Sequence, residues 1–196
     1  MKMVCATHNK NKVREFERIL APLGIEVLSC ADFDLFEDIE ENGVTFEENA
    51  ALKAKYVCNR LNLPAFADDS GITVEALDGA PGVYSARYGK AEFDDRDRRL
   101  YLLSQMEGKQ NRNAKFVCSI CLCFPNGQEK FVTEECCGEI GYEEKGENGF
   151  GYDSIFFVNG KSFGEMTDEE KDKISHRGKA TRKFSKILTE IGISGQ

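Results

Sequence analysis

Two adjacent aspartates, Asp68 and Asp69, directly follow the apolar run "LPAFA", which is typical of a short buried strand. Their carboxylates repel each other, and Ser70 and Gly71, which come next, offer no obvious cover. A carboxylate that is taken out of water is costly unless an opposite charge or hydrogen-bond donors meet it. The chain must therefore fold so that something positive lies against this pair.

Around this pair the sequence alternates extended and helical patterns. Strands are predicted at 2–6, 63–67, 114–124, 129–139 and 154–158, and helices at about 10–20, 45–61, 94–106 and 176–191. Capping boxes formed by Thr45 with Glu48 and by Thr167 with Glu170 mark helix starts. This alternation predicts an α/β fold with a mixed central sheet flanked by helices. The last helix is expected to face the core with Ala180, Phe184, Ile187, Leu188 and Ile191.

No linker or repeat divides the 196 residues, so we expect residues 1–196 to form a single domain. The formal net charge of -8 disfavours nonspecific binding to nucleic acid or to anionic lipid. No apolar run is long enough for a signal peptide or a membrane span, which favours a cytoplasmic protein. Among the eight cysteines, Cys118 and Cys121 fall on opposite faces of one predicted strand, so we expect reduced core thiols instead of a metal site or disulfides.

The loop "THNKNK" lies between the first predicted strand and the start of a helix. Free backbone N–H groups and the helix dipole favour an anion at such a position. The hydroxyl of Thr7, the amide of Asn9 and the ammonium of Lys12 all suit phosphate oxygens. A polar turn with an N-cap would produce the same residues, so both interpretations stay open for this loop alone.

The position of Lys53 on its helix indicates an anion site more specifically than this loop does. It falls on the same stripe of its helix as the apolar residues Phe46, Ala50, Val57 and Leu61. A lysine in that direction loses its hydration unless an anion meets it, which predicts an anion site. The alternative is an apolar stem with its charged tip in water.

The carboxyl end of a strand in an open α/β sheet is where ligands bind, and this is where Asp68 and Asp69 are predicted to lie. A hard cation with oxygen ligands, most often Mg²⁺, would explain paired carboxylates there, with Glu40 or Glu41 as a further ligand. Turn aspartates that bond to local backbone are the alternative.

Two later motifs are weaker by themselves. In "GFGYD" (149–153), glycines allow close approach, aromatic rings can stack on a flat ligand, and Asp153 can accept from a ring N–H. In "SHRG", His176 and Arg177 can donate to a carbonyl oxygen or a phosphate. A core aromatic loop and an ordinary helix start with Ser175 as N-cap would look the same.

Taken together, "THNKNK", "TFEENAALKA", "ADDSG", "GAPGVYSARY", "GFGYD" and "EEKDKISHRGKA" come in the order and spacing of the inosine/xanthosine triphosphate pyrophosphatase family, which the chain resembles over nearly its whole length. Enzymes of that family clear non-standard purine nucleotides. The resemblance implies two lobes around a substrate cleft, a homodimer, and Mg²⁺-dependent hydrolysis of ITP, dITP and XTP to the monophosphate and pyrophosphate.

The resemblance also assigns roles to residues. It implies that Asp69 is the proton acceptor, that Lys53 acts beside the triphosphate, and that Glu41 and Asp69 hold the metal. Two departures from the family pattern are Ser154, where proline is usual, and His8, where glycine is frequent. The implied substrate contacts are Thr7, His8, Asn9, Lys10, Asn11, Lys12, Ser70, Phe150, Gly151, Tyr152, Asp153, Lys171, His176 and Arg177.

Two other functions remain open at this point. One is a diphosphatase for pyrimidine or modified nucleotides on a similar fold, which a panel of substrates would separate. The other is a nonenzymatic module that binds nucleotides or nucleic acid through the basic last helix. The net charge of -8 and the acidic "ADDSG" segment argue against this module.

Overall fold

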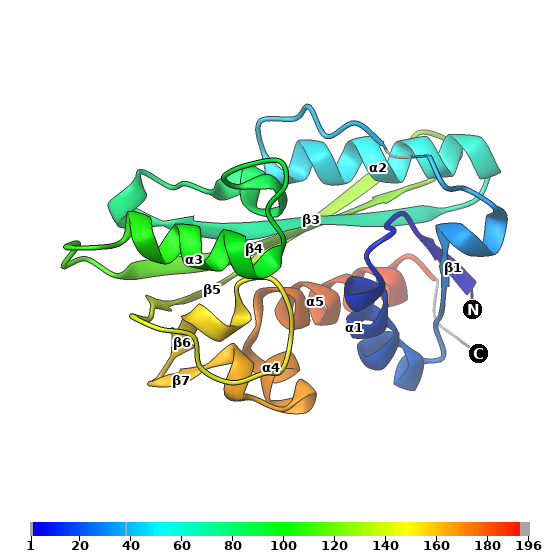
Figure 1. Cartoon of the computed structure of the whole chain (residues 1–196). Helices are drawn as coiled ribbons and strands as arrows, with labels where there is room; N and C mark the ends of the chain where they lie inside the picture. The colour runs from blue at the N-terminus through cyan, green and yellow to red at the C-terminus, as the bar shows by residue number, and fades with distance from the viewer. Residues whose placement is uncertain (1, 38, 193–196) are drawn as a thin grey trace. The chain divides into compact units, whose positions relative to one another are not determined.

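The computed structural model describes residues 2–37 and 39–192, and its architecture is α/β (Figure 1). Its strands are β1 (Lys2–Cys5), β2 (Glu26–Ser29), β3 (Ala65–Val74), β4 (Asn113–Cys123), β5 (Glu129–Ile140), β6 (Phe156–Val158) and β7 (Lys161–Ser162). Its α-helices are α1 (Lys10–Leu20), α2 (Phe46–Leu61), α3 (Asp95–Gln105), α4 (Asp168–Ile174) and α5 (His176–Glu190). No helix in these two described ranges is long and apolar enough to cross a membrane.

The seven strands form one sheet in the order β2-β1-β3-β4-β5-β6-β7. β1 is parallel to β2 and to β3, whereas the β5–β6 and β6–β7 pairs are antiparallel. Parallel neighbours need a crossover, and α1 and α2 supply it between β1, β2 and β3. The predicted mixed sheet flanked by helices is confirmed.

The chain divides into two compact units, each with its own apolar core. The described residues up to 69, together with 118–134 and 177–192, form the first unit. Residues 70–117 and 135–176 form the second unit. The long strands β3, β4 and β5 contribute residues to both units.

In the first unit, two apolar clusters cover opposite faces of the sheet. On one face, Phe66 of β3 packs between Phe16 of α1 and Phe184 of α5, with ring centroids 5.1 and 5.2 Å away. On the other face, the small side chains of α2 pack on β1, β3 and β4. Cys118 belongs to the first cluster and Cys121 to the second, as predicted for one strand. All eight cysteines are free, and only Cys137 is exposed.

In the second unit, the core lies between α3 and the strand segments of β3 to β6 that belong to this unit. Phe116 of β4 contacts Phe156 of β6 with ring centroids 4.7 Å apart, and Leu102 of α3 is fully buried in the same cluster. Phe163 stacks on Phe116 at 5.9 Å. This core supports the loop that contains "GFGYD".

Two helix starts follow the residues that mark them. The Thr45 hydroxyl accepts from the backbone N–H of Glu48, and the Glu48 carboxylate accepts from that of Thr45. Thr167 and Glu170 make the same reciprocal pair at α4. The capping box at Thr45 fixes the position of α2, which carries Lys53.

Two expectations about element bounds are wrong. β3 continues to Val74, so Asp68 and Asp69 lie in the middle of a strand and not at its carboxyl end. The strand can continue because cations meet both side chains, as described below. Ile191 is 37% exposed and does not face the core, because α5 ends one residue earlier, at Glu190. The sequence did not predict β2 and β7, which are too short to show a clear alternation.

Candidate active site

The first group of site residues lies around the carboxylate of Asp68, which is fully buried in the first unit. Its Oδ2 atom accepts from Nη2 of Arg177 at 3.0 Å and Nε at 3.2 Å, and lies 3.1 Å from Nζ of Lys12. Burial by itself raises the pKa of a carboxyl group, but Lys12 and Arg177 outweigh it and hold the pKa of Asp68 well below its usual range. Asp68 is therefore a permanent negative charge that anchors two cations.

Arg177 is held on its other side by Glu15 of α1, whose Oε2 atom lies 2.5 Å from Nη1. Both side chains are buried. Three nitrogens of the guanidinium are thus committed to two carboxylates of the chain itself. This arrangement favours a structural role for Arg177, while its direct contact with substrate stays a prediction.

The second group lies one residue further along β3. Lys53 of α2 is 8% exposed, which confirms that it points with the apolar stripe. Its Nζ atom lies 2.6 Å from Oε1 of Glu41 and 3.5 Å from Oδ1 of Asp69. The anions that meet Lys53 are therefore carboxylates of the chain itself, where the sequence had led us to expect a ligand anion.

Electrostatics distinguish Asp69 from its neighbour Asp68. Burial raises the pKa of Asp69 above its ordinary value, and the nearby Lys53 and Lys12 only partly offset this. For Lys53, burial lowers the pKa, but Asp69, Asp68 and Glu41 together raise it above the ordinary value, so the side chain stays charged. Asp68 is thus held as an anion, and Asp69 is the stronger base of the two.

Asp69 and Glu41 converge from two elements on the same ammonium group, so the two carboxylates are close enough to share one cation. Carboxylate oxygens are the ligands that Mg²⁺ prefers, and Mg²⁺ usually takes only one or two of them together with waters and phosphate. The residues present therefore fit a divalent cation. Within residues 2–37 and 39–192 no group of three candidate metal ligands occurs, and Glu40 is exposed.

The "THNKNK" loop is ordered by its own side chains. Asn9 is the N-cap of α1, and its Oδ1 atom accepts from the backbone N–H groups of Asn11 at 3.0 Å and Lys12 at 3.2 Å. The Thr7 hydroxyl accepts from the N–H of Asn9 at 3.2 Å. Two of the N–H groups expected to bind an anion are thus already occupied. The loop offers an anion mainly its exposed side chains, among them His8, Lys10 and Asn11.

The predicted base-binding residues lie in the second unit. Oδ2 of Asp153 accepts from Nζ of Lys171 at 2.7 Å and from the N–H of Phe150 at 2.8 Å. The Lys171 ammonium also lies over the half-buried ring of Phe150, 4.8 Å from its centroid. Gly149 is required here, because its φ is +76° and an added Cβ would lie 2.1 Å from Asp153. Asp153 therefore orders the loop.

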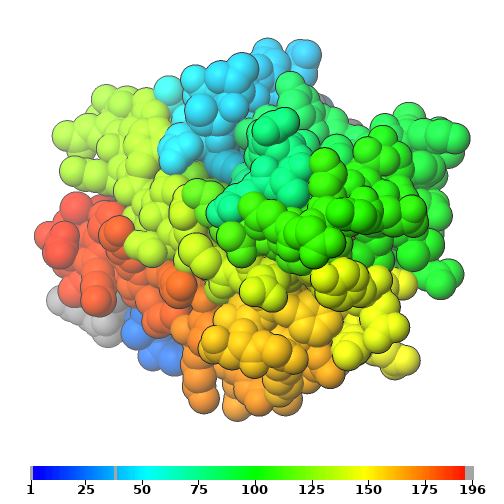
Figure 2. Space-filling model, turned by 90° about the vertical axis from the view of Figure 1, so that its left-hand side faces the viewer, coloured from blue at the N-terminus to red at the C-terminus, as the bar shows by residue number. Residues whose placement is uncertain are grey.

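Other contacts hold the same loop. Arg99 of α3 donates to the carbonyl oxygen of Gly151 at 2.8 Å and to Glu144 at 2.5 Å. Figure 2 shows the yellow loop beside the green α3 at the surface. The hydroxyl of Tyr152 donates to the carbonyl oxygen of Ser85 at 2.7 Å. Tyr152 is therefore part of the core, and Phe150 is the aromatic residue of the motif that remains partly accessible.

His176 is buried and stacks on Phe116, with ring centroids 4.6 Å apart and planes 7° from parallel. His176 is thus not a surface residue at the start of α5. Ser70 is half-buried on β3, and Ser154 donates to Glu144 at 3.3 Å. The structure brings together Phe150, Asp153 and Lys171 in the second unit, and Lys12, Lys53, Glu41, Asp69 and Arg177 in the first.

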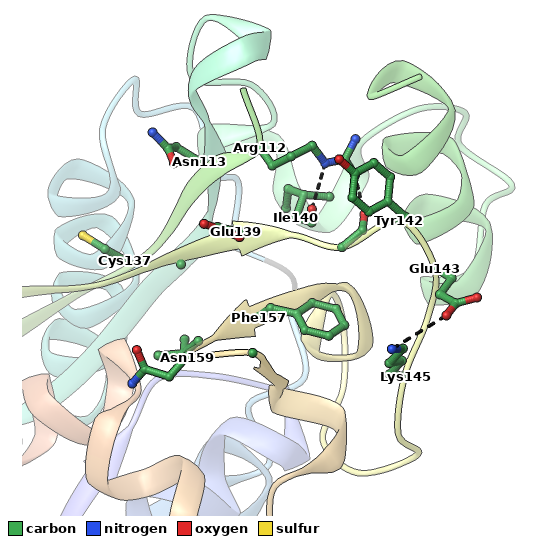
Figure 3. A pocket seen from close by; sticks show the side chains of 14 residues that line it. Arg112, Asn113, Cys137, Glu139, Ile140, Tyr142, Glu143, Lys145, Phe157 and Asn159 are labelled. Carbon is green, nitrogen blue, oxygen red and sulfur yellow. Dashed lines mark hydrogen bonds and ion pairs between the residues drawn. The ribbon is translucent and has the colours of Figure 1, made fainter. Parts of the chain in front are cut away.

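A separate pocket of about 590 Å³ lies in the second unit (Figure 3). Arg112 stacks over Tyr142 at 4.4 Å and donates to the carbonyl oxygen of Ile140 at 2.9 Å, so its charge is committed to the strand end. The ring of Phe157 packs against Gly141, and a Cβ on this glycine would lie 2.3 Å from the ring. None of the predicted site residues lines this pocket, which is therefore distinct from both groups described above.

Sequence reasoning missed two buried polar residues, Glu15 and Asn49. Glu15 lies three residues after Lys12, and Asn49 four residues before Lys53, so each shares a helix face with a predicted cation. A search for polar partners at these spacings would have found both. Asn49 donates from Nδ2 to Oδ2 of Asp69 at 3.1 Å.

Comparison with known proteins settles the family. The model of the Ham1 family matches residues 3–187. The chain belongs to the Ham1 family. Among the relatives of this Ham1 chain, a dITP/XTP pyrophosphatase from Haemophilus influenzae is 50% identical over 185 residues, which cover 91% of this chain and 94% of that protein. A dITP/XTP pyrophosphatase from Bacillus subtilis is 46% identical over 189 residues, which cover 94% and 96%. The family predicted from the motifs is thereby confirmed.

Solved structures agree with this assignment. The Ham1 protein of Staphylococcus aureus aligns with a TM-score of 0.87 and 37% identity over 97% of this chain and 99% of that one. A HAM1 protein from Coxiella burnetii aligns with a TM-score of 0.89 and 39% identity over the same shares of the two chains. The mixed sheet described above is thus the Ham1 fold.

The Arg177 network predicts a large loss of stability when the arginine is removed. Arg177→Met should lower the free energy of unfolding by about 3–5 kcal/mol, because Asp68 and Glu15 stay buried with less counter-charge. Urea unfolding would measure this loss. Arg182→Met, the same change at an exposed position of α5, should cost less than about 1 kcal/mol. Equal losses for the two variants would contradict the network.

Proposed function

We propose that this Ham1 protein hydrolyses dITP, XTP and ITP to the nucleoside monophosphate and pyrophosphate in the presence of Mg²⁺. The enzyme class predicted from the motifs is confirmed by relatives that are named dITP/XTP pyrophosphatases. The observation that carries the rest of the proposal is the convergence of Glu41, Asp69 and Lys53. The carboxylates of Glu41 and Asp69 are a pair of oxygen ligands, Asp69 is also the base, and Lys53 is the cation. Such an enzyme would remove non-standard purine nucleotides from the nucleotide pool.

Different residues of the first unit would have different roles in binding and hydrolysing the triphosphate. Lys12 and the exposed side chains of the "THNKNK" loop would hold the triphosphate, and Lys53 would offset the charge that develops on the departing pyrophosphate. Glu41 and Asp69 would hold Mg²⁺, which supplies Lewis-acid stabilisation of phosphoryl charge when it is bound. Asp69 would accept a proton from the water that attacks the α-phosphorus.

The residues of the second unit would select the base. The half-buried ring of Phe150, which has the Lys171 ammonium over it, is a surface on which a purine can stack. A 6-oxo purine presents an acceptor at O6 and a donor at N1, and adenine presents the reverse. Donors from Lys171, His176 or the loop backbone would therefore favour hypoxanthine and xanthine over adenine, since adenine would leave these groups unpaired.

Magnesium and a cytoplasmic location stay predictions from the sequence, and a homodimer stays a prediction from the family resemblance. The direct contacts of substrate with Thr7 to Lys12, Ser70, Phe150 to Asp153, Lys171, His176 and Arg177 are proposals of the same kind. The pyrimidine diphosphatase and the nonenzymatic module are not favoured by the named relatives.

The first test is the identity of the products. With dITP or XTP and Mg²⁺, the initial products should be the monophosphate and pyrophosphate, because the attack is at the α-phosphorus. Chromatography of early time points with a pyrophosphate assay would identify them, and dATP and dUTP serve as control substrates. Initial release of orthophosphate and a diphosphate, or a preference for dUTP, would overturn the proposal.

Lys53 supplies a second prediction. Lys53→Met should lower kcat by about tenfold or more, which is ~1.4 kcal/mol of lost transition-state stabilisation. Some stability should be lost as well, because Glu41 and Asp69 lose their shared counter-charge. Lys55→Met on the exposed side of α2 removes only a surface pair with Glu129 and should leave kcat unchanged. Steady-state kinetics decides, and full activity of Lys53→Met would exclude a role for this lysine in the reaction.

A further inference from the structure

Asn49 lies in the first turn and a half of α2 and is fully buried. It comes four residues before Lys53, so both side chains point from the same helix face. A buried amide is costly unless its donor and its acceptor both find partners. The partners of Asn49 therefore indicate why an amide stands at this position.

The two ends of the Asn49 amide bind two different elements. Nδ2 donates to Oδ2 of Asp69 on β3 at 3.1 Å. Oδ1 accepts from the backbone N–H of Gly43 at 2.8 Å, two residues after Glu41 in the loop before α2. A backbone N–H can only donate, so these contacts fix which end of the amide is the oxygen.

The close approach of the loop to Asn49 is built into the sequence by a glycine. A Cβ on Gly43 would lie 2.7 Å from Oδ1 of Asn49 and 2.8 Å from Cβ of Glu48. Only glycine lets the loop backbone come this near to the helix. The loop that carries Glu41 thus packs directly against Asn49, which also contacts Asp69.

We propose that Asn49 is a positioning residue that holds Glu41 and Asp69 in one geometry. Its donor fixes Oδ2 of Asp69, which leaves Oδ1 turned toward Lys53. Its acceptor anchors the loop that brings Glu41 to the same lysine. The residue touches neither phosphate nor base in this role and acts only through the two carboxylates. This inference rests on the proposed function, in which those carboxylates serve as proton acceptor and cation ligands.

Two substitutions separate the two bonds. Asn49→Asp keeps an acceptor for Gly43 and the size of the side chain, but it replaces the donor to Asp69 by a second carboxylate. Asn49→Leu has a similar volume and removes both bonds. The matched control is Asn59→Asp, the same chemical change on an exposed position of α2.

We expect both Asn49 variants to lower kcat for dITP by about tenfold or more, with KM changed by less than about threefold, because the contacts that hold the nucleotide are intact. Asn59→Asp should match the wild-type enzyme. Circular dichroism and thermal unfolding would establish how much of each variant is folded, and kcat is expressed per folded protein. If both variants keep kcat while losing only stability, Asn49 is a packing residue and the proposal is wrong.

A measurement without turnover tests the same role. Mn²⁺ serves as the probe, and its free concentration is followed by electron paramagnetic resonance in the absence of nucleotide. Asn49→Leu should weaken Mn²⁺ binding by about tenfold or more, because the two carboxylates are no longer held together. Unchanged Mn²⁺ affinity would overturn the proposal. Failure of the wild-type enzyme to release pyrophosphate from dITP or XTP would instead refute the proposed function.

Discussion

Pairing of the buried carboxylate of Asp68 with Arg177 and Lys12 determines much of the first unit. Through these contacts, β3, α1 and α5, which are far apart in the sequence, meet at one atom, Oδ2 of Asp68. A buried charge of this kind is tolerated only when its partners are in place. The pairing therefore permits a strand to carry two aspartates in its interior, and it fixes the start of α1 where the "THNKNK" loop ends.

The neighbouring residue, Asp69, lies on the same strand but has a different role. Side chains alternate along a strand, so Asp69 points away from the Asp68 network and toward α2, where it meets Lys53 and Asn49. Its carboxylate is less well neutralised, and burial raises its pKa. Two adjacent aspartates thus have opposite electrostatics, because each faces a different layer of the fold. The stable charge of Asp68 supports the structure, and Asp69, which is the more basic of the two, is suited to accept a proton.

Much of this arrangement could be predicted from the sequence. Capping boxes and apolar spacing located α2 and α4, and the stripe position of Lys53 predicted its burial. The partners of Lys53 could not be predicted, because Glu41 lies in an irregular loop without periodicity. The length of β3 was missed, because two adjacent charges normally end a buried strand and the cations that permit them come from distant segments. Glu15 and Asn49 were overlooked, because a single polar residue on a helix is usually solvated.

The different roles of the two aspartates can be tested by measuring kcat and the free energy of unfolding for Asp68→Asn and Asp69→Asn. Asp69→Asn should lower kcat by about 10² or more and leave stability within about 1 kcal/mol of wild type, since a charge disfavoured by burial is removed. Asp68→Asn should lose about 3–5 kcal/mol of stability, because Arg177 and Lys12 lose their shared carboxylate. Full activity of Asp69→Asn, or wild-type stability of Asp68→Asn, would contradict this division of roles.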